Sequence, residues 1–240
     1  MLTSRDLDVV RQDGYGITPN VIDSERLNQI LKELERVGVD EAVSQRAGTA
    51  FGIRNLLNIM PAARELANSV SLRSLIEPVL GPQAKVVRGI CFDKHKDANW
   101  KVIWHQDLTI AVRRKTDAEG YGPWSVKAGI AHVQPPVSVL ERMLAIRLHL
   151  DDTDESNGAL RVIPGSHRRG RLDAENIQSL TSDRTFTTCP VSKGGVMLMR
   201  PLLLHSSSPA LIPRHRRVLH FEYSSTGLPG GVEWYECQGM

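Results

Sequence analysis

Apolar positions in the first third of the chain recur with the spacing of an amphipathic helix. Between Ser24 and Gly38 they fall on one face, which predicts a helix capped by Ser24 and ended by Gly38. Pro61 is expected to open a short helix that runs to about residue 69. Ser71 is expected to cap a further helix over 72–80, before Gly81. Residues 1–81 are therefore predicted to be mainly helical.

After Gly81 the pattern changes to short apolar runs separated by glycine and proline. These runs predict strands over 84–94, 101–107, 143–152, 159–165, 194–205 and 216–223. Asn157-Gly158 and Pro164-Gly165 are typical of turns. Helices followed by many short strands favour one α+β domain over 1–240, with a mainly β core that is a sandwich or barrel.

The connection over 108–141 is longer than the others. Connections of this length are usually functional or disordered. It carries Tyr121, Trp124, His132 and Gln134 among prolines and glycines. We interpret it as an ordered lid, with a surface insertion as the alternative.

Composition excludes several classes of protein. The formal charge of +3 is small and the basic residues are spread along the chain, so we expect no nucleic-acid binding. The three cysteines are widely spaced and predict neither a disulfide framework nor a zinc site. The first residues are charged where a signal peptide is apolar, and the apolar runs are too short to span a bilayer. We therefore expect a cytoplasmic protein with no membrane partner, whose oligomeric state the sequence does not indicate.

Candidate chemistry begins at the run WHQD, 104–107. In a strand, His105 and Asp107 would project from one face and Gln106 from the other. Such a pair can hold a metal ion, and it can also be a chance polar pair at a strand end. A third ligand is available in His205, at the end of the predicted strand 194–205. Two histidines and one carboxylate suit iron(II) and leave further coordination positions open.

Three stretches with these residues resemble the phytanoyl-CoA dioxygenase family of iron(II)- and 2-oxoglutarate-dependent oxygenases. They are WHQD (104–107), DDTDESNGALRVIPGSH (151–167) and HSSSPALIPRHRR (205–217), and QDGYGITPNVIDSERLNQI (12–30) looks like the opening of the family. The resemblance implies a double-stranded β-helix, or jelly roll, backed by the N-terminal helices. It also implies that His105, Asp107 and His205 hold Fe(II), with 2-oxoglutarate and O2 as co-substrates.

The same resemblance assigns residues to the cofactor pocket. An arginine beyond the second histidine grips the distal carboxylate of 2-oxoglutarate, which points to Arg216, with Arg214 and Arg217 as competitors. Ser207 matches a serine that helps hold that carboxylate. Arg88 and Arg147 are placed on strands that line the pocket, although exposed strand arginines are an equal alternative.

Strand alternation bears on the choice among the arginines. Arg216, Val218, His220 and Glu222 share one face of the predicted strand, and Arg217, Leu219, Phe221 and Tyr223 share the other. Hydrophobicity alone would turn the second set toward the cavity. If helices cover the outer face, however, the apolar set packs on them and Arg216 faces the cavity.

The implied reaction is hydroxylation of an unactivated C–H bond of a small molecule, with release of succinate and CO2. Related halogenating enzymes carry glycine or alanine where this chain has Asp107, so hydroxylation, desaturation or ring closure is favoured. The basic residues of the connection, Arg113, Arg114, Lys115 and Lys127, indicate an anionic substrate or only a solvated loop. Trp124, His132 and Gln134 are the candidates for substrate contact.

Two alternatives to this function remain: a cupin-type metalloenzyme that does not use 2-oxoglutarate, and a non-catalytic small-molecule binding protein on the same barrel.

Overall fold

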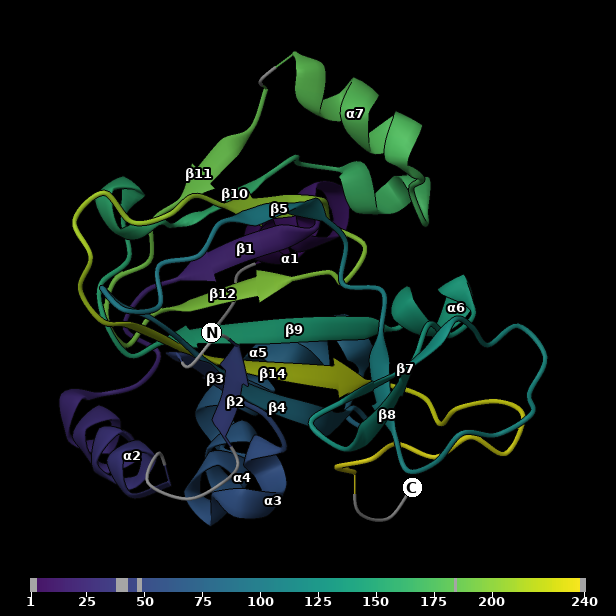
Figure 1. The fold of residues 1–240 in the computed structure, drawn as a ribbon, viewed down its shortest axis with the longest axis horizontal. Helices are drawn as coiled ribbons and strands as arrows, with labels where there is room; N and C mark the ends of the chain where they lie inside the picture. The colour runs from purple at the N-terminus through teal and green to yellow at the C-terminus, as the bar shows by residue number, and fades with distance from the viewer. Residues whose placement is uncertain (1–3, 38–42, 47–48, 184, 238–240) are drawn as a thin grey trace.

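Two antiparallel sheets form the centre of the protein (Figure 1). The computed structural model describes residues 4–37, 43–46, 49–183 and 185–237. The larger sheet has seven strands in the order β1-β12-β9-β14-β4-β3-β2, and the smaller has four in the order β11-β10-β13-β5. The strands of the two sheets are β1 (Tyr15–Thr18), β2 (Val43–Arg46), β3 (Thr49–Ile53), β4 (Lys85–Lys94), β5 (Val102–His105), β9 (Met143–His149), β10 (Leu160–Val162), β11 (Thr187–Cys189), β12 (Val196–Met199), β13 (His205–Ser207) and β14 (Arg216–Ser224).

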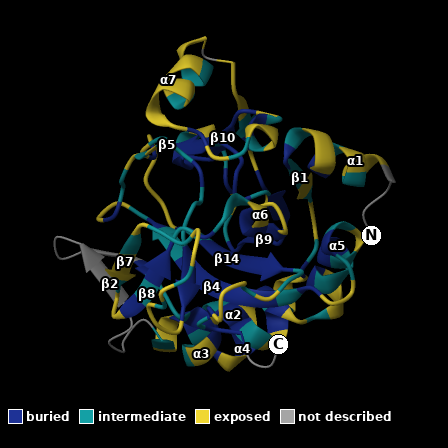
Figure 2. Ribbon diagram, turned by 90° about the vertical axis from the view of Figure 1, so that its right-hand side faces the viewer, coloured by how far each residue is buried: buried dark blue, intermediate teal, exposed yellow. Residues whose placement is uncertain are grey.

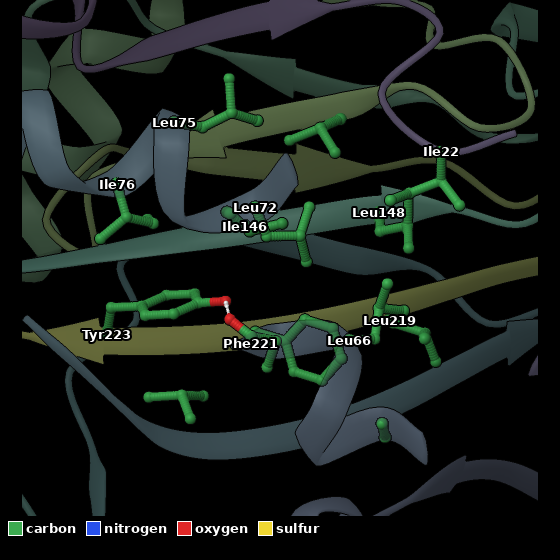
Figure 3. Close-up of a cluster of buried hydrophobic side chains, with 14 of the residues drawn as sticks. Ile22, Leu66, Leu72, Leu75, Ile76, Ile146, Leu148, Leu219, Phe221 and Tyr223 are labelled. Atoms are coloured by element: carbon green, nitrogen blue, oxygen red, sulfur yellow. Dashed lines mark hydrogen bonds between the residues drawn. The ribbon is translucent and has the colours of Figure 1, made fainter. Parts of the chain in front are cut away.

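Helices cover one face of the larger sheet. The helices of the described chain are α1 (Ser4–Asp13), α2 (Ser24–Val37), α3 (Leu56–Ile59), α4 (Pro61–Ala67), α5 (Val70–Leu80), α6 (Val137–Leu140) and α7 (Ala174–Ser182), with 3₁₀ turns at Glu155–Asn157 and Ser166–Arg169. Figure 3 shows Leu66 and Leu72, from α4 and α5, beside Ile146, Leu219 and Phe221 of the sheet, all of them buried. Burying one such side chain contributes roughly 1.5–3 kcal/mol, so this contact fixes the helices on the sheet.

The opposite face of the same strands is polar but equally buried. On β14 the residues that alternate with Leu219 and Phe221 are His220 and Glu222, and both are shielded from solvent. On β9, Arg147 and His149 alternate in the same way with buried leucines and isoleucines. Figure 2 shows β9 and β14 in dark blue, with β5 and β10 of the smaller sheet above them and the helices α3 and α4 below. The sheet therefore presents an apolar face to the helices and a charged face to the interior.

Two of the predicted helix caps are wrong by one or two residues. The side chain of Asp23, not Ser24, accepts a hydrogen bond from the backbone N–H of Arg26 at 2.8 Å, and α2 already includes Ser24. Helix α5 is capped by Ser69, whose extended backbone lets its hydroxyl accept from Leu72, while Ser71 lies within the helix. Pro61 opens α4 and Gly81 ends α5 as predicted. Gly38 lies outside the described residues.

The predicted strand 194–205 is two strands in different sheets. Strand β12 ends at Met199, and β13 begins at His205 after a turn through Pro201. Proline lacks the N–H that would continue the ladder, and this physical signal was hidden by the apolar residues on both sides of it. His205 therefore starts a strand of the smaller sheet instead of ending one of the larger.

Residues 1–81 also contribute strands that the sequence analysis did not predict. Strand β1 pairs with β12 at the edge of the larger sheet, with Tyr15 opposite Met199. Strand β3 pairs with β4, with Ile53 opposite Cys91. The helical region is thus joined to the sheet by hydrogen bonds as well as by packing.

The long connection folds as a small sheet of its own. Strands β6 (Ile110–Val112), β8 (Ile130–Val133) and β7 (Trp124–Lys127) form it, and α6 follows. One side packs on an apolar cluster with Val232 and Trp234 near the C-terminus. The connection is therefore ordered; whether it moves over a ligand stays a prediction. Within the described residues, no helix has both the length and the apolar character needed to cross a bilayer.

We expect Tyr223→Phe to lower the free energy of unfolding by about 1–3 kcal/mol. The buried hydroxyl of Tyr223 donates to the carbonyl oxygen of Ala67 at 2.7 Å (Figure 3), and its loss leaves that acceptor unsatisfied. Urea denaturation measures the change. Tyr121→Phe is the matched control, because its hydroxyl bonds the backbone of Pro229 at the surface and its loss should cost less than about 0.5 kcal/mol. Equal effects of the two changes would contradict the role assigned to the buried bond.

Candidate metal centre and cofactor pocket

A cavity of about 650 Å³ lies between the two sheets and receives the polar face of the larger one. Its size falls within the about 300–1,000 Å³ of small-molecule sites. The lining side chains come from β4, β5, β9, β13, β14 and the long connection. Residues from distant parts of the chain therefore converge on one space.

His105, Asp107 and His205 meet at the wall of this cavity. Strands β5 and β13 are paired with His105 opposite His205, although the two residues are 100 positions apart (205 − 105). The Asp107 carboxylate lies 3.6 Å from Nε2 of His105 and 3.8 Å from Nε2 of His205. One ligand atom of each residue lies within 4.8 Å of the other two, which suits a shared metal ion.

Asp107 lies two residues beyond the end of β5, yet its side chain joins that of His105 in the cavity while Gln106 points away, as the predicted alternation requires. Strand β5 ends at His105, and the backbone N–H of Asp107 donates to the carbonyl of Pro201 at 2.9 Å. The amide of Gln106 points away and donates to the carbonyls of Gly170 and Leu202. These bonds fix the segment that carries the carboxylate beside the histidines.

Both histidines are fixed in the tautomer that a metal ligand needs. The Nδ1 atom of His105 lies 2.8 Å from the carbonyl oxygen of Ile103, and that of His205 lies 2.8 Å from the carbonyl oxygen of Leu203. A carbonyl oxygen only accepts, so each Nδ1 carries the hydrogen and each Nε2 turns a free lone pair toward Asp107. The donor set of two imidazole nitrogens and a carboxylate fits iron(II).

The charges of Asp107 and His205 agree with metal binding at neutral pH. Burial opposes protonation of His105, but its contact with Asp107 outweighs burial and raises the pKa of this histidine, so a metal ion competes with a proton there. Burial opposes ionisation of Asp107, but His205 and His105 outweigh it and hold the pKa of the carboxyl well below its usual range. Burial lowers the pKa of His205 to about 4. A carboxylate and a neutral imidazole are the forms that coordinate a metal without first losing a proton.

Two buried arginines face the cavity without an acidic partner. Arg216 is 3% exposed and donates from Nη1 to the carbonyl of Gly158 at 2.6 Å, while its Nε has no partner. Arg147 contacts Nδ1 of His220 at 3.3 Å, and its Nε is also unpaired. Burial lowers the pKa of each guanidinium to about 10. Neither forms an ion pair with any carboxylate of the described residues. An anion that binds at this end of the cavity would therefore be stabilised by both charges.

Lys94 belongs to the same end and was missed by the sequence analysis. Its ammonium donates to the hydroxyl of Ser207 at 3.0 Å and to the carbonyl of Ser208 at 2.7 Å. Burial and the nearby Arg216 and Arg147 lower the pKa of Lys94 to about 7. The pairing of β14 with β4 could have identified Lys94, because Lys94 lies opposite Arg216 in it.

The two competing arginines lie elsewhere. Arg217 binds both oxygens of Asp151 at 2.8 and 2.9 Å and is outside the cavity lining. Arg214 pairs with Asp154 at the surface. The structure therefore places Arg216, alone among the three, in the cavity.

At the other end of the cavity Arg88 is already paired. It bonds the carboxylate of Glu222 at 3.1 Å, and its second nitrogen lies 3.3 Å from Nε2 of His132. His132 is thus behind Arg88 and does not line the cavity, and Trp124 packs in the apolar cluster of the small sheet. Of the three residues expected to contact substrate, only Gln134 lines the cavity.

Most of the basic residues expected to attract an anion are also elsewhere. Arg113 pairs with Glu233 at the surface, and Arg114 and Lys115 are exposed. Lys127 does line the cavity. The lining also includes polar residues that the sequence analysis did not assign to a site, among them Arg54, His220 and Glu222.

The model of the phytanoyl-CoA dioxygenase family matches residues 10–218. This chain belongs to that family. The predicted family is confirmed, and with it the enzyme class of a 2-oxoglutarate-dependent non-haem iron oxygenase with Fe(II) and 2-oxoglutarate as cofactors. Among curated relatives, the ectoine dioxygenase of Bordetella parapertussis is 22% identical over 254 residues, which cover 93% of this chain and 76% of that protein.

Solved structures of the same fold confirm the predicted jelly roll. EctD from S. alaskensis superposes with a TM-score of 0.74 at 19% identity, covering 95% of this chain and 79% of EctD. AviO1 from Streptomyces viridochromogenes superposes with a TM-score of 0.69 at 18% identity, covering 95% of this chain and 99% of AviO1. EctD has been solved with bound Fe, and with 2-oxoglutarate and 5-hydroxyectoine.

We expect Asp107→Ala to weaken iron(II) binding by more than about 100-fold. Losing only an outer partner of a metal ligand costs about 10–100-fold, and this change removes a ligand together with the negative charge of the three-residue group. Titration with iron(II) or cobalt(II) under nitrogen measures the affinity. His215→Ala is the control, since His215 is exposed and pairs with Asp93. Equal affinities in the two variants would exclude Asp107 as a ligand.

Proposed function

We propose that this protein is an iron(II)- and 2-oxoglutarate-dependent dioxygenase that hydroxylates an unactivated C–H bond of a small molecule and releases succinate and CO2. One observation carries the proposal. The cavity that receives the His105, Asp107 and His205 group also holds Arg216 and Arg147, two buried guanidiniums without an acidic partner. A metal site beside an anion site is the arrangement that a metal-bound dicarboxylate requires.

Arg216 is the residue proposed to bind the distal carboxylate of 2-oxoglutarate. Its planar fork suits two parallel bonds to a carboxylate, and its unpaired Nε offers a donor for them. Ser207 and Lys94 lie beside it, joined by their own hydrogen bond. Arg147 supplies a second positive charge, so the pocket balances a dianion better than a single arginine would.

The remaining cavity is proposed to orient the substrate and exclude water. Iron(II) bound at the three ligands would supply the activation of dioxygen that the reaction needs. Ile90, Phe92 and Leu160 give the cavity apolar walls. Because Asp107 would occupy a coordination position of bound iron, the proposed site favours hydroxylation over halogenation. The relative from Bordetella parapertussis, an ectoine dioxygenase, supports a small polar solute as the substrate, and ectoine is the first compound to test.

The unpaired arginines also weigh against the alternatives. A metalloenzyme that does not bind 2-oxoglutarate, or a non-catalytic binding protein, would have no use for two uncompensated charges beside the metal site. Burying such charges without a counter-ion costs several kcal/mol each, and a dicarboxylate offsets that cost.

Iron-loaded protein should consume 2-oxoglutarate under air and release succinate. Asp107→Ala and His205→Ala should reduce the rate by more than about 100-fold, because both remove a ligand, and excess chelator should have the same effect. Chromatographic measurement of succinate provides the readout. Succinate release that survives metal removal would overturn the proposal.

Arg216→Ala should raise the KM for 2-oxoglutarate by roughly 30-fold or more. The loss of a buried charge-assisted partner costs about 2–5 kcal/mol, and each 1.4 kcal/mol is about tenfold in affinity. Arg217→Ala should leave the KM within a factor of about three, since Arg217 binds Asp151 outside the cavity. The reverse pattern would show that the cosubstrate lies on the other face of β14.

A further inference from the structure

We propose that the cavity contains a second anion subsite, formed by Arg54 and Lys127, which binds a carboxylate or phosphate group of the substrate. Both residues line the cavity. The assignment of this group to the substrate rests on the proposed function, because it assumes that 2-oxoglutarate occupies the end at Arg216.

The two anion subsites lie toward opposite ends of the same strand pair. In the ladder between β4 and β14, Arg216 stands opposite Lys94, while Glu222 stands opposite Arg88. Six residues of strand separate the two pairs, which is about 20 Å between backbones. Arg54 follows β3, whose Ile53 pairs with Cys91 of β4, and it therefore lies nearer to Arg88. Arg54 is offset from Lys94, the partner of Arg216, by about four positions along β4, which is roughly 13 Å between backbones.

The nearby carboxylate does not neutralise this subsite. Glu222 accepts hydrogen bonds from Arg88 at 3.1 Å and from His220 at 3.3 Å, so Arg88 already takes its charge. His132 adds no negative charge. Its Nδ1 donates to the carbonyl of Ile130, which leaves Nε2 to accept from Arg88 as a neutral ring.

Arg54 and Lys127 remain as two positive charges that lack a counter-ion. Arg54 is half-buried, and no hydrogen bond or ion pair joins it to another residue of the described chain. The ammonium of Lys127 has one neutral partner, the hydroxyl of Thr109 at 3.3 Å. Burial lowers the pKa of Lys127, and repulsion from Arg88 and Arg54 lowers it further, against a smaller opposing attraction from Asp107 and Glu222. Two cations that repel each other at one wall of a cavity are stabilised by an anion placed between them.

The chemistry of the subsite indicates what kind of group it accepts. The arginine fork offers paired donors to a carboxylate or phosphate, and the lysine adds a movable point charge. Because Lys127 comes from β7 and Arg54 from the end of β3, the subsite forms only when the small sheet is in place. We therefore infer a substrate with an acidic group, oriented by it toward the metal site.

The test is a calorimetric titration with inorganic phosphate at constant ionic strength. The protein is loaded with zinc(II), which is redox-inert, and saturated with 2-oxoglutarate so that the site at Arg216 is filled. Wild type should bind phosphate at one site. Arg54→Gln and Lys127→Gln should each weaken this binding by about tenfold or more. Lys115→Gln removes the same charge from an exposed position of the same connection and should change nothing. Absence of phosphate binding in wild type, or unchanged binding in both cavity variants, would overturn the proposal.

A pair of organic probes separates charge from shape. Benzoate should displace phosphate from the zinc-loaded protein, whereas benzamide, which has the same ring without the charge, should not. Displacement by benzoate identifies the subsite as one that accepts carboxylates, and failure of benzoate alone would restrict it to phosphate groups. Equal displacement by both probes would refute an anion subsite.

The affinity for 2-oxoglutarate distinguishes failure of this inference from failure of the proposed function. Arg54→Gln should keep that affinity within about threefold of wild type. A loss as large as that of Arg216→Ala would assign Arg54 to the cosubstrate, which refutes the second subsite and leaves the proposed function intact. If wild type does not bind 2-oxoglutarate at all, the proposed function fails, and the phosphate titration in an Arg216→Ala background still tests the pair of Arg54 and Lys127.

Discussion

The packing of β14 on the helices is the constraint on which the site depends. Leu219, Phe221 and Tyr223 need an apolar surface, and α4 and α5 provide it on one side of the sheet. Because side chains alternate along a strand, the same contact turns Arg216, His220 and Glu222 to the other side. The charged residues thus enter the interior as a consequence of how the apolar ones are covered. A cavity with buried charges is then possible only where those charges pair with one another or with a ligand.

The buried polar side chains form a chain of hydrogen bonds along the polar face of the larger sheet. Arg147 donates to Nδ1 of His220, so the Nε2–H of that histidine donates to Glu222, and Glu222 in turn binds Arg88. The histidine therefore lies between Arg147, which has no carboxylate partner among the described residues, and the ion pair of Arg88 with Glu222. Within the described residues this path leaves Arg216 at one end and Arg54 at the other without a carboxylate. The proposed cosubstrate and substrate subsites are the two places where the internal charges are not balanced.

Much of this site could be predicted, because it depends on residue types that bind metals and on the alternation of side chains along one strand, β14. His105, Asp107 and His205 were found as metal-ligand types, and Arg216 was chosen by asking which face of a strand helices would cover. The failures have physical causes. The apolar residues 202–204 continue the pattern of β12 past Pro201, although Leu203 closes a turn onto Arg200 and Leu204 bonds Ser166 and Ile163 instead of a strand of the larger sheet. Strand β1 has only four residues, too few for alternation to be visible. Arg54 follows β3 in the helical region, and nothing local marks a residue whose role comes from a distant pairing.

The proposed metal and cosubstrate residues and the proposed substrate residues come from different parts of the fold. The metal ligands and Arg216 stand on or directly beside strands of the two central sheets, which are held by long hydrogen-bonded ladders. Lys127 and Gln134 come from the connection over 108–141, whose apolar cluster attaches it beside those sheets. The aromatic and histidine residues that drew attention to the connection, Trp124 and His132, serve to build and attach it. The ladders would thus preserve the oxidative chemistry, while changes in an attached sheet alter which substrate reaches it.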